Sequence, residues 1–373
     1  MSEPANSRPE SAEERAAALL ADAARAAYGR QARATVALED LHRPERYRLS
    51  EFQIHTIRQL LDGLIDAVEG DLRARLLARA ELPDNSAFVA SIGAAHVAIA
   101  GPVMRRAGLP DDAALATVLL RRADEYRIMR QLRKAASVTE NGVLDRLMDE
   151  PDSAIAASAM RHLIAETRSN DRLDDPHIAR ADLPAEVDKA LVWSVAAALR
   201  AYGEREHGIE GAALDAPITA SAREMVESRT AEAALESAAM DLAGHLDRHR
   251  LIDDRLLAET LGGARLALYA ALLGEKAHLP FGTAWDMATA PDAAAHALLL
   301  RHLGVERDMA AFLATAMARA VIGDDRAGEE CAARRIEGYE AMDAEAIEAA
   351  MRPWRLDIAY RTALARLDAG DRA

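Results

Sequence analysis

The sequence predicts an all-α protein built as an α-solenoid of helical repeats, in two halves joined by longer helices. One observation is composition: alanine and leucine dominate and aromatic residues make up only 4% of the chain, which favours helix over sheet. A second is a short sequence motif that recurs at the expected start of each repeat. It begins at Leu82, Leu109 and Val138 in the first half and at Leu251, Leu279 and Val305 in the second. The spacing of about 26 to 30 residues is typical of stacked helix pairs, each too small to bury its apolar face alone.

The clearest copy of the repeat is the stretch from Leu109 to Ala136. Proline suits the first turn of a helix, and Asp111 after Pro110 can accept a hydrogen bond from the first free amides. Apolar residues then recur at helical spacing until a polar break at Asp124, and a second apolar face follows as far as Leu132. We therefore predict one helical hairpin here, with its break at Asp124.

If the copies are equivalent, each is a helix pair and each buries one apolar side chain at the same place. These five side chains are Phe88, Leu115, Leu144, Leu257 and Trp285.

Before the repeats, residues 1–47 are predicted to be a disordered N-terminus followed by one helix. Met1–Glu10 has little to bury. Ser11 with Glu14 three residues later, and Ser50 with Gln53, each have the spacing of a capping box that starts a helix.

Two helical halves follow, residues 48–170 and 171–373. The first is expected to end with a helix whose apolar face includes Met160 and Ile164. The polar stretch Thr167–Pro184 marks the boundary, because a loop of this length inside a compact domain is uncommon. In the second half, a long helix is expected from about Ala220 to His249.

Composition also excludes several classes of function. The net charge of −15 opposes binding to a phosphate backbone, so nucleic acid is not an expected partner. No apolar run reaches the roughly 20 residues of a membrane-spanning helix, and Cys331 is the single cysteine. The N-terminus has no signal peptide, so we expect a cytoplasmic protein. The sequence predicts no cofactor and leaves the oligomeric state open.

Three sequence segments resemble those of a known family. They are Arg48–Glu51 leading into Leu60–Ile65, Ala181–Glu186 leading into Leu191–Arg200, and Arg265–Leu273. From about residue 48 to the C-terminus the chain resembles an uncharacterised bacterial family of all-helical proteins, a domain of unknown function with HEAT-like repeats. The resemblance implies the fold, and it implies no catalytic or binding residue.

A basic cluster is unusual in so acidic a chain and is a candidate docking face for another protein. Arg127, Arg130 and Lys134 fall on one helical stripe, and guanidinium groups suit the carboxylates of an acidic segment. The alternative is an ordinary solvated helix face. The whole cluster consists of Arg121, Arg122, Arg127, Arg130, Arg133 and Lys134.

Two Glu-x-x-His spacings, Glu204 with His207 and Glu275 with His278, match the motif used by di-iron sites in helical bundles. However, His207 precedes a glycine and His278 precedes Leu279 and a proline, so both lie at predicted helix ends. There a histidine is also expected as the cation that suits the negative end of the helix dipole.

A third candidate places one carboxylate and two imidazoles on a single helix face. Asp241, His245 and His249 are spaced four residues apart and could hold zinc or copper. Because the first and last ligands lie about 12 Å apart on a straight helix, at most two of them could bind one ion. The alternative is again a solvated polar face.

The sequence contains no glycine-rich phosphate loop, nucleophile elbow or paired-cysteine zinc spacing, and we predict no catalytic residue. The first functional hypothesis is therefore a protein-protein interaction scaffold or adaptor with a protein partner. The second is a helical metal-binding protein or metalloenzyme that uses the Glu-x-x-His pairs or the Asp241–His249 face. A third is a small-molecule sensor with its pocket between the two halves.

Overall fold

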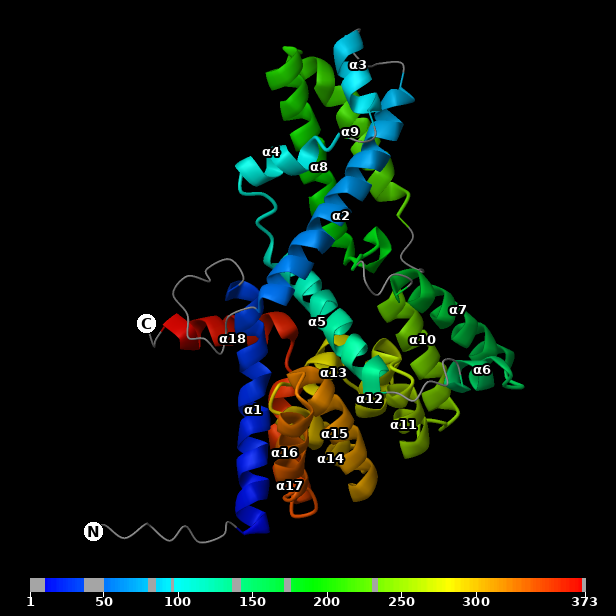
Figure 1. The fold of residues 1–373 in the computed structure, drawn as a ribbon, viewed down its shortest axis with the longest axis vertical. Helices are drawn as coiled ribbons and strands as arrows, with labels where there is room; N and C mark the ends of the chain where they lie inside the picture. Colours follow the sequence, from blue (N-terminus) through cyan, green and yellow to red (C-terminus); the bar gives the residue numbers. More distant parts are fainter. Residues whose placement is uncertain are drawn as a thin grey trace. The chain divides into compact units, whose positions relative to one another are not determined.

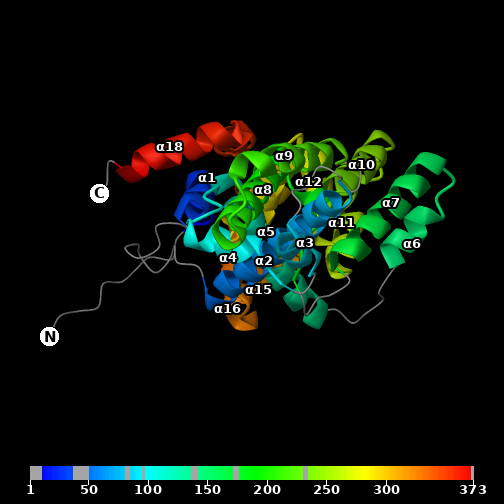
Figure 2. The same ribbon diagram turned by 90° about the horizontal axis from the view of Figure 1, so that it is seen from above.

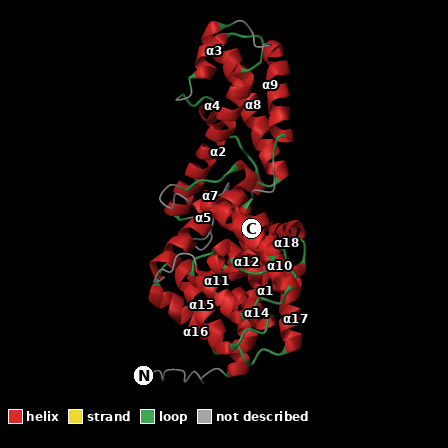
Figure 3. Cartoon of the chain, turned by 90° about the vertical axis from the view of Figure 1, so that its right-hand side faces the viewer, coloured by secondary structure: helices red, strands yellow, loops and turns green. Residues whose placement is uncertain are grey.

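The computed structural model describes residues 11–36, 50–79, 85–94, 97–135, 142–170, 176–229 and 234–370. In these ranges the chain forms eighteen α-helices and two short 3-10 helices, with no strand (Figures 1 and 3), which confirms the all-α prediction. None of these helices combines the length and apolarity needed to cross a membrane. The predicted disorder of Met1–Glu10 lies outside the described residues.

The chain divides into two compact units, and both are assembled from separate stretches. Unit 1 contains residues Met1–Glu39, Glu125–Ile164 and Ala238–Ala373, and unit 2 contains Asp40–Asp124 and Ala165–Ser237. The boundary predicted from the sequence, by contrast, divides the chain in order at residue 170. Three helices begin in one unit and end in the other: α5 (Ala113–Ala135), α7 (Ser153–Asn170) and α10 (Leu235–Arg248).

Unit 2 is organised around one long helix. This helix is α2 (Glu51–Leu77), whose apolar face is almost fully buried from Leu60 to Leu76. Four other helices lie wholly in the unit and pack against α2: α3 (Ser86–Gly93), α4 (Ala100–Arg106), α8 (Ala185–His207) and α9 (Gly211–Glu227). The unit also contains a 3-10 turn, η2 (Arg180–Asp182).

Unit 1 gathers the N-terminal helix and the C-terminal third of the chain. Figures 1 and 2 show α18 beside α1, which also contacts α14, α16 and α17. The helices lying wholly in unit 1 are α1 (Ala12–Val36), α6 (Gly142–Met148), α11 (Asp254–Gly262), α12 (Leu266–Ala277), α13 (Phe281–Ala288), α14 (Ala294–His302), α15 (Arg307–Ile322), α16 (Asp325–Ile336), α17 (Ala344–Met351), η3 (Arg352–Arg355) and α18 (Ile358–Gly370).

The two capping boxes predicted from the sequence are both present in the structure. The Ser11 amide donates to the Glu14 carboxylate at 2.7 Å, and the Glu14 amide donates to the Ser11 hydroxyl at 3.1 Å. Ser50 and Gln53 make the same reciprocal pair at the start of α2. Both boxes satisfy amides that a helix start leaves without an intrahelical partner.

Two consecutive helices follow five of the six predicted repeat openings: α3 and α4, α6 and α7, α11 and α12, α13 and α14, and α15 and α16. Among these, α11 packs against α12, α13 against α14, and α15 against α16. The five side chains predicted to occupy equivalent positions, from Phe88 to Trp285, are all at most 2% exposed.

The predicted hairpin within Leu109–Ala136 is wrong, because α5 is one continuous helix. This segment holds no glycine or proline from Ala113 to Ala135, and a single aspartate does not stop a helix of good formers. Asp124 accepts a hydrogen bond from the Gln53 amide group at 2.8 Å instead of breaking the helix. The N-terminal cap is also shifted by one residue, since Asp112 and not Asp111 accepts from the first free amides.

Two further predictions need correction. The long helix expected from Ala220 to His249 is split into α9, which ends at Glu227, and α10, which begins at Leu235. In addition, α7 leaves Met160 47% and Ile164 61% exposed, although both were predicted to lie on its buried face. Helical periodicity identifies an apolar stripe but does not guarantee that another element covers it.

The two helices of the α15–α16 pair approach each other so closely that one contact requires glycine. A Cβ atom on Gly328 would lie 2.6 Å from the Cα atom of Arg319. We expect Gly328→Ala to lower the free energy of unfolding of unit 1 by about 1–3 kcal/mol, because overpacking forces the backbones apart. Urea unfolding followed by circular dichroism measures this loss.

The matched control is Gly262→Ala, since a Cβ atom there would meet no other atom within 4 Å. We expect this change to alter the stability by less than about 1 kcal/mol. A Gly328→Ala protein as stable as the Gly262→Ala protein would contradict the close approach of the two helices.

Candidate functional site

The structure divides the predicted basic cluster into anchored and exposed side chains. Arg121 is partly buried and forms an ion pair with Glu236 at 3.1 Å. Arg130, Arg133 and Lys134 are exposed near the end of α5.

The two remaining arginines of the cluster bind backbone carbonyls within their own units. In unit 2 the buried Arg122 guanidinium donates to the carbonyls of Ser169 and His177. In unit 1 Arg127 donates to the carbonyl of Val321 in the last turn of α15, where helix carbonyls lack intrahelical partners. Arg122 and Arg127 therefore hold the fold, and a docking face on α5 is reduced to the exposed cations.

The two Glu-x-x-His pairs belong to different units. Glu204 pairs with Arg200 at 2.7 Å and His207 is the last residue of α8, both in unit 2. Glu275 lies on α12 and His278 caps the end of that helix, both in unit 1. Both histidines occupy helix ends, as their sequence neighbours predict.

The side chains of Asp241, His245 and His249 do not converge on one site either. His249 lies beyond the end of α10 and contacts Asp152 at 3.1 Å, while His245 accepts a hydrogen bond from Arg248. Asp241 is exposed on α10. Across the described ranges, no three His, Cys, Asp or Glu side chains are grouped so that they could hold a metal ion.

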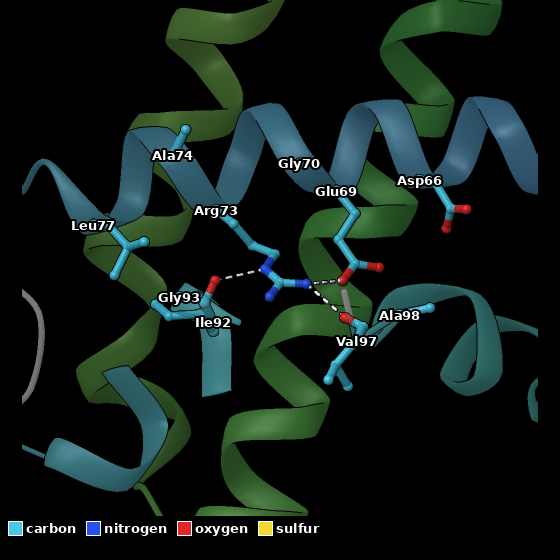
Figure 4. Close-up of a pocket in the computed structure, with 10 residues that line it drawn as sticks. All are labelled: Asp66, Glu69, Gly70, Arg73, Ala74, Leu77, Ile92, Gly93, Val97 and Ala98. Atoms are coloured by element: carbon cyan, nitrogen blue, oxygen red, sulfur yellow. Dashed lines mark hydrogen bonds and ion pairs between the residues drawn. The ribbon is translucent and has the colours of Figure 1, made fainter. Parts of the chain in front are cut away.

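Two features with binding potential emerge that the sequence analysis does not single out. The first is a cavity of about 330 Å³ in unit 2, between α2 and the segment that connects α3 to α4 (Figure 4). Beside it, Glu69 and Arg73 form a buried ion pair at 2.7 Å, one helical turn apart on α2.

Both side chains of this ion pair also make hydrogen bonds to backbone groups of the protein. The Arg73 guanidinium donates to the carbonyls of Ile92 and Val97 at 2.7 Å each, and to two more carbonyls of the same segment. The Glu69 carboxylate accepts from the amides of Ile99 and Ala100 at the start of α4. Since all five N–H groups of an arginine are thus used, this guanidinium is a clasp for the connecting segment and has no donor left for an anionic ligand.

The second feature is a groove of about 380 Å³ in unit 1, which we call the α15 groove. Phe312, Ala316 and Ala320 line it from α15 at four-residue spacing, so they share one helix face. The other walls are the last turn of α5 and the end of α11, and the lining includes Leu132, Lys134 and Leu261.

Phe312 is the large apolar residue of this groove that faces solvent, and it is 53% exposed. Its neighbour Leu313 on α15 is fully buried, so the helix is well packed and only its outer face is open. On α5, Arg130 lies one turn before Lys134 on the same face, whereas Arg133 does not line the groove and is turned by about 100° around the helix from Lys134. The groove therefore combines an apolar floor with a positive rim.

The cations of this rim belong to the basic cluster predicted from the sequence, whereas the apolar floor was not predicted. The only available signal is the i, i+4, i+8 spacing of Phe312, Ala316 and Ala320, which also fits an ordinary core face. Similarly, Glu69 and Arg73 interrupt the apolar face of α2 with opposite charges four residues apart, which is the available signal for the buried clasp.

The fold and these surfaces define an all-helical protein with apolar recesses and without a recognisable cluster of catalytic or metal-ligating side chains among the described residues. The chain belongs to the family DUF2336, described as an uncharacterised protein conserved in bacteria, whose model matches residues 99–352. This confirms the resemblance to an uncharacterised bacterial family. No curated protein and no solved structure matches the chain.

Proposed function

We propose that this protein is an interaction scaffold whose helix pairs form a HEAT-like array, and that its α15 groove holds an acidic amphipathic helix of another protein. The observation that carries this proposal is the half-exposed Phe312 at a groove with a positive rim, in a chain whose net charge is −15. Aromatic side chains at the edge of an apolar recess are common anchors of protein interfaces.

The shape of the groove favours a helix as its occupant. Ala316 and Ala320 are small, so a second backbone can approach α15 closely between Phe312 and the end of α5. An amphipathic helix that lays its apolar face in such a groove is a recurring mode of peptide recognition.

The charges favour an acidic occupant. Lys134 lines the groove and Arg130 extends the same face of α5. The other cation of the lining, Arg319, is already paired with Asp325 at 2.9 Å. Complementary charges at a rim raise the association rate and select against partners of like charge.

A fluorescent peptide tests the proposal directly. The probe is a helix-forming peptide with leucines at i, i+3, i+4 and i+7 flanked by glutamates, and a second probe carries lysines in place of the glutamates. We expect the acidic peptide to bind more tightly in fluorescence anisotropy, with affinity that falls as salt rises. Phe312→Ala should weaken binding at least about tenfold, a loss of about 1.4 kcal/mol.

Charge reversal separates the rim from the rest of the cluster. The Arg130→Glu/Lys134→Glu protein should lose the preference for the acidic peptide, while the control Arg133→Glu should keep it. Arg127 is left unchanged because it anchors α15. Equal binding of both peptides, or an undiminished affinity in Phe312→Ala, would contradict the proposal.

A further inference from the structure

The cavity beside the Glu69–Arg73 ion pair is also lined by a second carboxylate of α2, that of Asp66. Asp66 lines it from α2 on the same side of the helix as Glu69 and Arg73 (Figure 4). Among the described residues it has neither a hydrogen bond nor an ion pair, and its side chain is exposed at the cavity.

The other charges near Asp66 are already neutralised in pairs. Glu69 is bound to Arg73 at 2.7 Å, and Asp62 is paired with Arg105 at 2.9 Å. The carboxylate of Asp66 is therefore the uncompensated charge of this group. Desolvation and, to a lesser degree, the negative charges of Glu69 and Asp62 raise its pKa, although Arg105 opposes the shift.

The remainder of the cavity is aliphatic. Ala74, Leu77, Ile92, Val97 and Ala98 contribute apolar surface, and Gly70 and Gly93 leave space because they have no side chain. Leu77 and Val97 are 41% and 43% exposed, so apolar surface faces water at the cavity mouth. Exposed large aliphatic side chains that border a recess are typical of a ligand-binding surface.

We propose that this cavity binds a small organic cation with an aliphatic portion, such as an alkylammonium ion. The Asp66 carboxylate would pair with the cationic group, and the side chains of Leu77 and Val97 would cover the aliphatic part. Because Arg73 has no free donor, the cavity would not select an anion of similar shape.

Three probes of the same length separate charge from apolar contact: hexylammonium, hexanol and hexanoate. We expect isothermal titration calorimetry at constant ionic strength to show saturable binding of hexylammonium, at least about tenfold tighter than hexanol, with hexanoate weakest. Asp66→Asn should abolish the preference for the cation and leave the weak affinity for hexanol. Leu77→Ser should weaken binding of hexylammonium and hexanol together.

The matched control is Asp111→Asn, which makes the same charge change at an exposed position of unit 2 that does not line the cavity. It should leave the preference for hexylammonium intact. The proposal is overturned if hexanol binds as tightly as hexylammonium, if Asp66→Asn keeps the full preference, or if no probe binds saturably. These outcomes are independent of the α15 groove, which lies in the other unit.

Discussion

Replacing Asp188 with alanine is expected to destabilise unit 2 by about 3–5 kcal/mol, because it removes one member of a buried charge network. Asp188 lies in the first turns of α8 and its side chain is fully buried. Arg180 donates to both of its oxygens, at 2.8 and 2.9 Å, and Arg229 lies 3.7 Å away. Without this carboxylate, two largely buried guanidinium groups lose their shared counter-charge.

Hydrogen exchange followed by mass spectrometry measures the effect, because the amides of α8 and α9 should lose protection. Glu186→Ala is the matched control: Glu186 is in the same first turn of α8 but is exposed, and it pairs only at 3.6 Å with Lys189. We expect this control to change stability by less than about 0.5 kcal/mol. If both variants lose equally little protection, Asp188 does not hold the unit together.

This network also explains the polar stretch that sequence analysis singles out as a boundary. Within its described part, Asp182 accepts from the Leu235 amide at 3.1 Å, and Arg229 donates to the carbonyl of Leu183 at 2.5 Å. Arg180 of the same stretch binds Asp188. These contacts attach residues 180–184 to the helices of unit 2, so we assign this segment the role of stabilising that unit.

Local signals in the sequence predict local structure well. The Ser11 and Ser50 capping boxes depend on residues three apart, and both form as predicted. The regular apolar spacing identifies buried positions such as Leu115 and Trp285, because a residue at the centre of an apolar stripe is covered by almost any packing of that stripe.

Features that depend on which surface a neighbour covers could not be predicted. Arg122 and Arg130 belong to one basic cluster in the sequence, yet Arg122 is buried against backbone carbonyls and Arg130 is exposed. Phe312 and Met160 both lie on an apolar stripe of their helix, as core residues do, yet both are exposed. Their environment is decided by helices distant in sequence, about which helical periodicity carries no information.

Acid is expected to destabilise unit 1 through buried histidines. His162 on α7 and His296 on α14 are fully buried, and in the described part of the chain neither ring nitrogen of His162 has a hydrogen-bond partner. Burial lowers the pKa of each to about 3, and the positive charge of Arg265 contributes at His162. The Nε2 atom of His296 lies 2.8 Å from the Tyr269 hydroxyl, and this neutral ring is part of the core.

The direction of the effect follows from where the protons bind. An unfolded histidine has a pKa of about 6.5, so between pH 6.5 and 3 the unfolded chain binds protons that the folded chain excludes. Stability should therefore be independent of these groups above about pH 7 and fall as the pH drops through that window. At pH 5 the loss is about 2 kcal/mol for each histidine, and His302, whose pKa burial also lowers, acts in the same direction.

Urea unfolding at pH 7, 6 and 5 checks this prediction, followed by tryptophan fluorescence because Trp285 and Trp354 are both buried in unit 1. His162→Leu should unfold at pH 7 with a stability no lower than that of the wild type, because it removes a buried polar ring without hydrogen bonds and leaves an apolar side chain. It should also lose about 2 kcal/mol less than the wild type between pH 7 and pH 5. His55→Leu, a change at an exposed position of α2, should keep the full pH dependence of the wild type. Identical pH dependence in the His162→Leu and wild-type proteins would show that protonation of this buried ring does not limit the acid stability of unit 1.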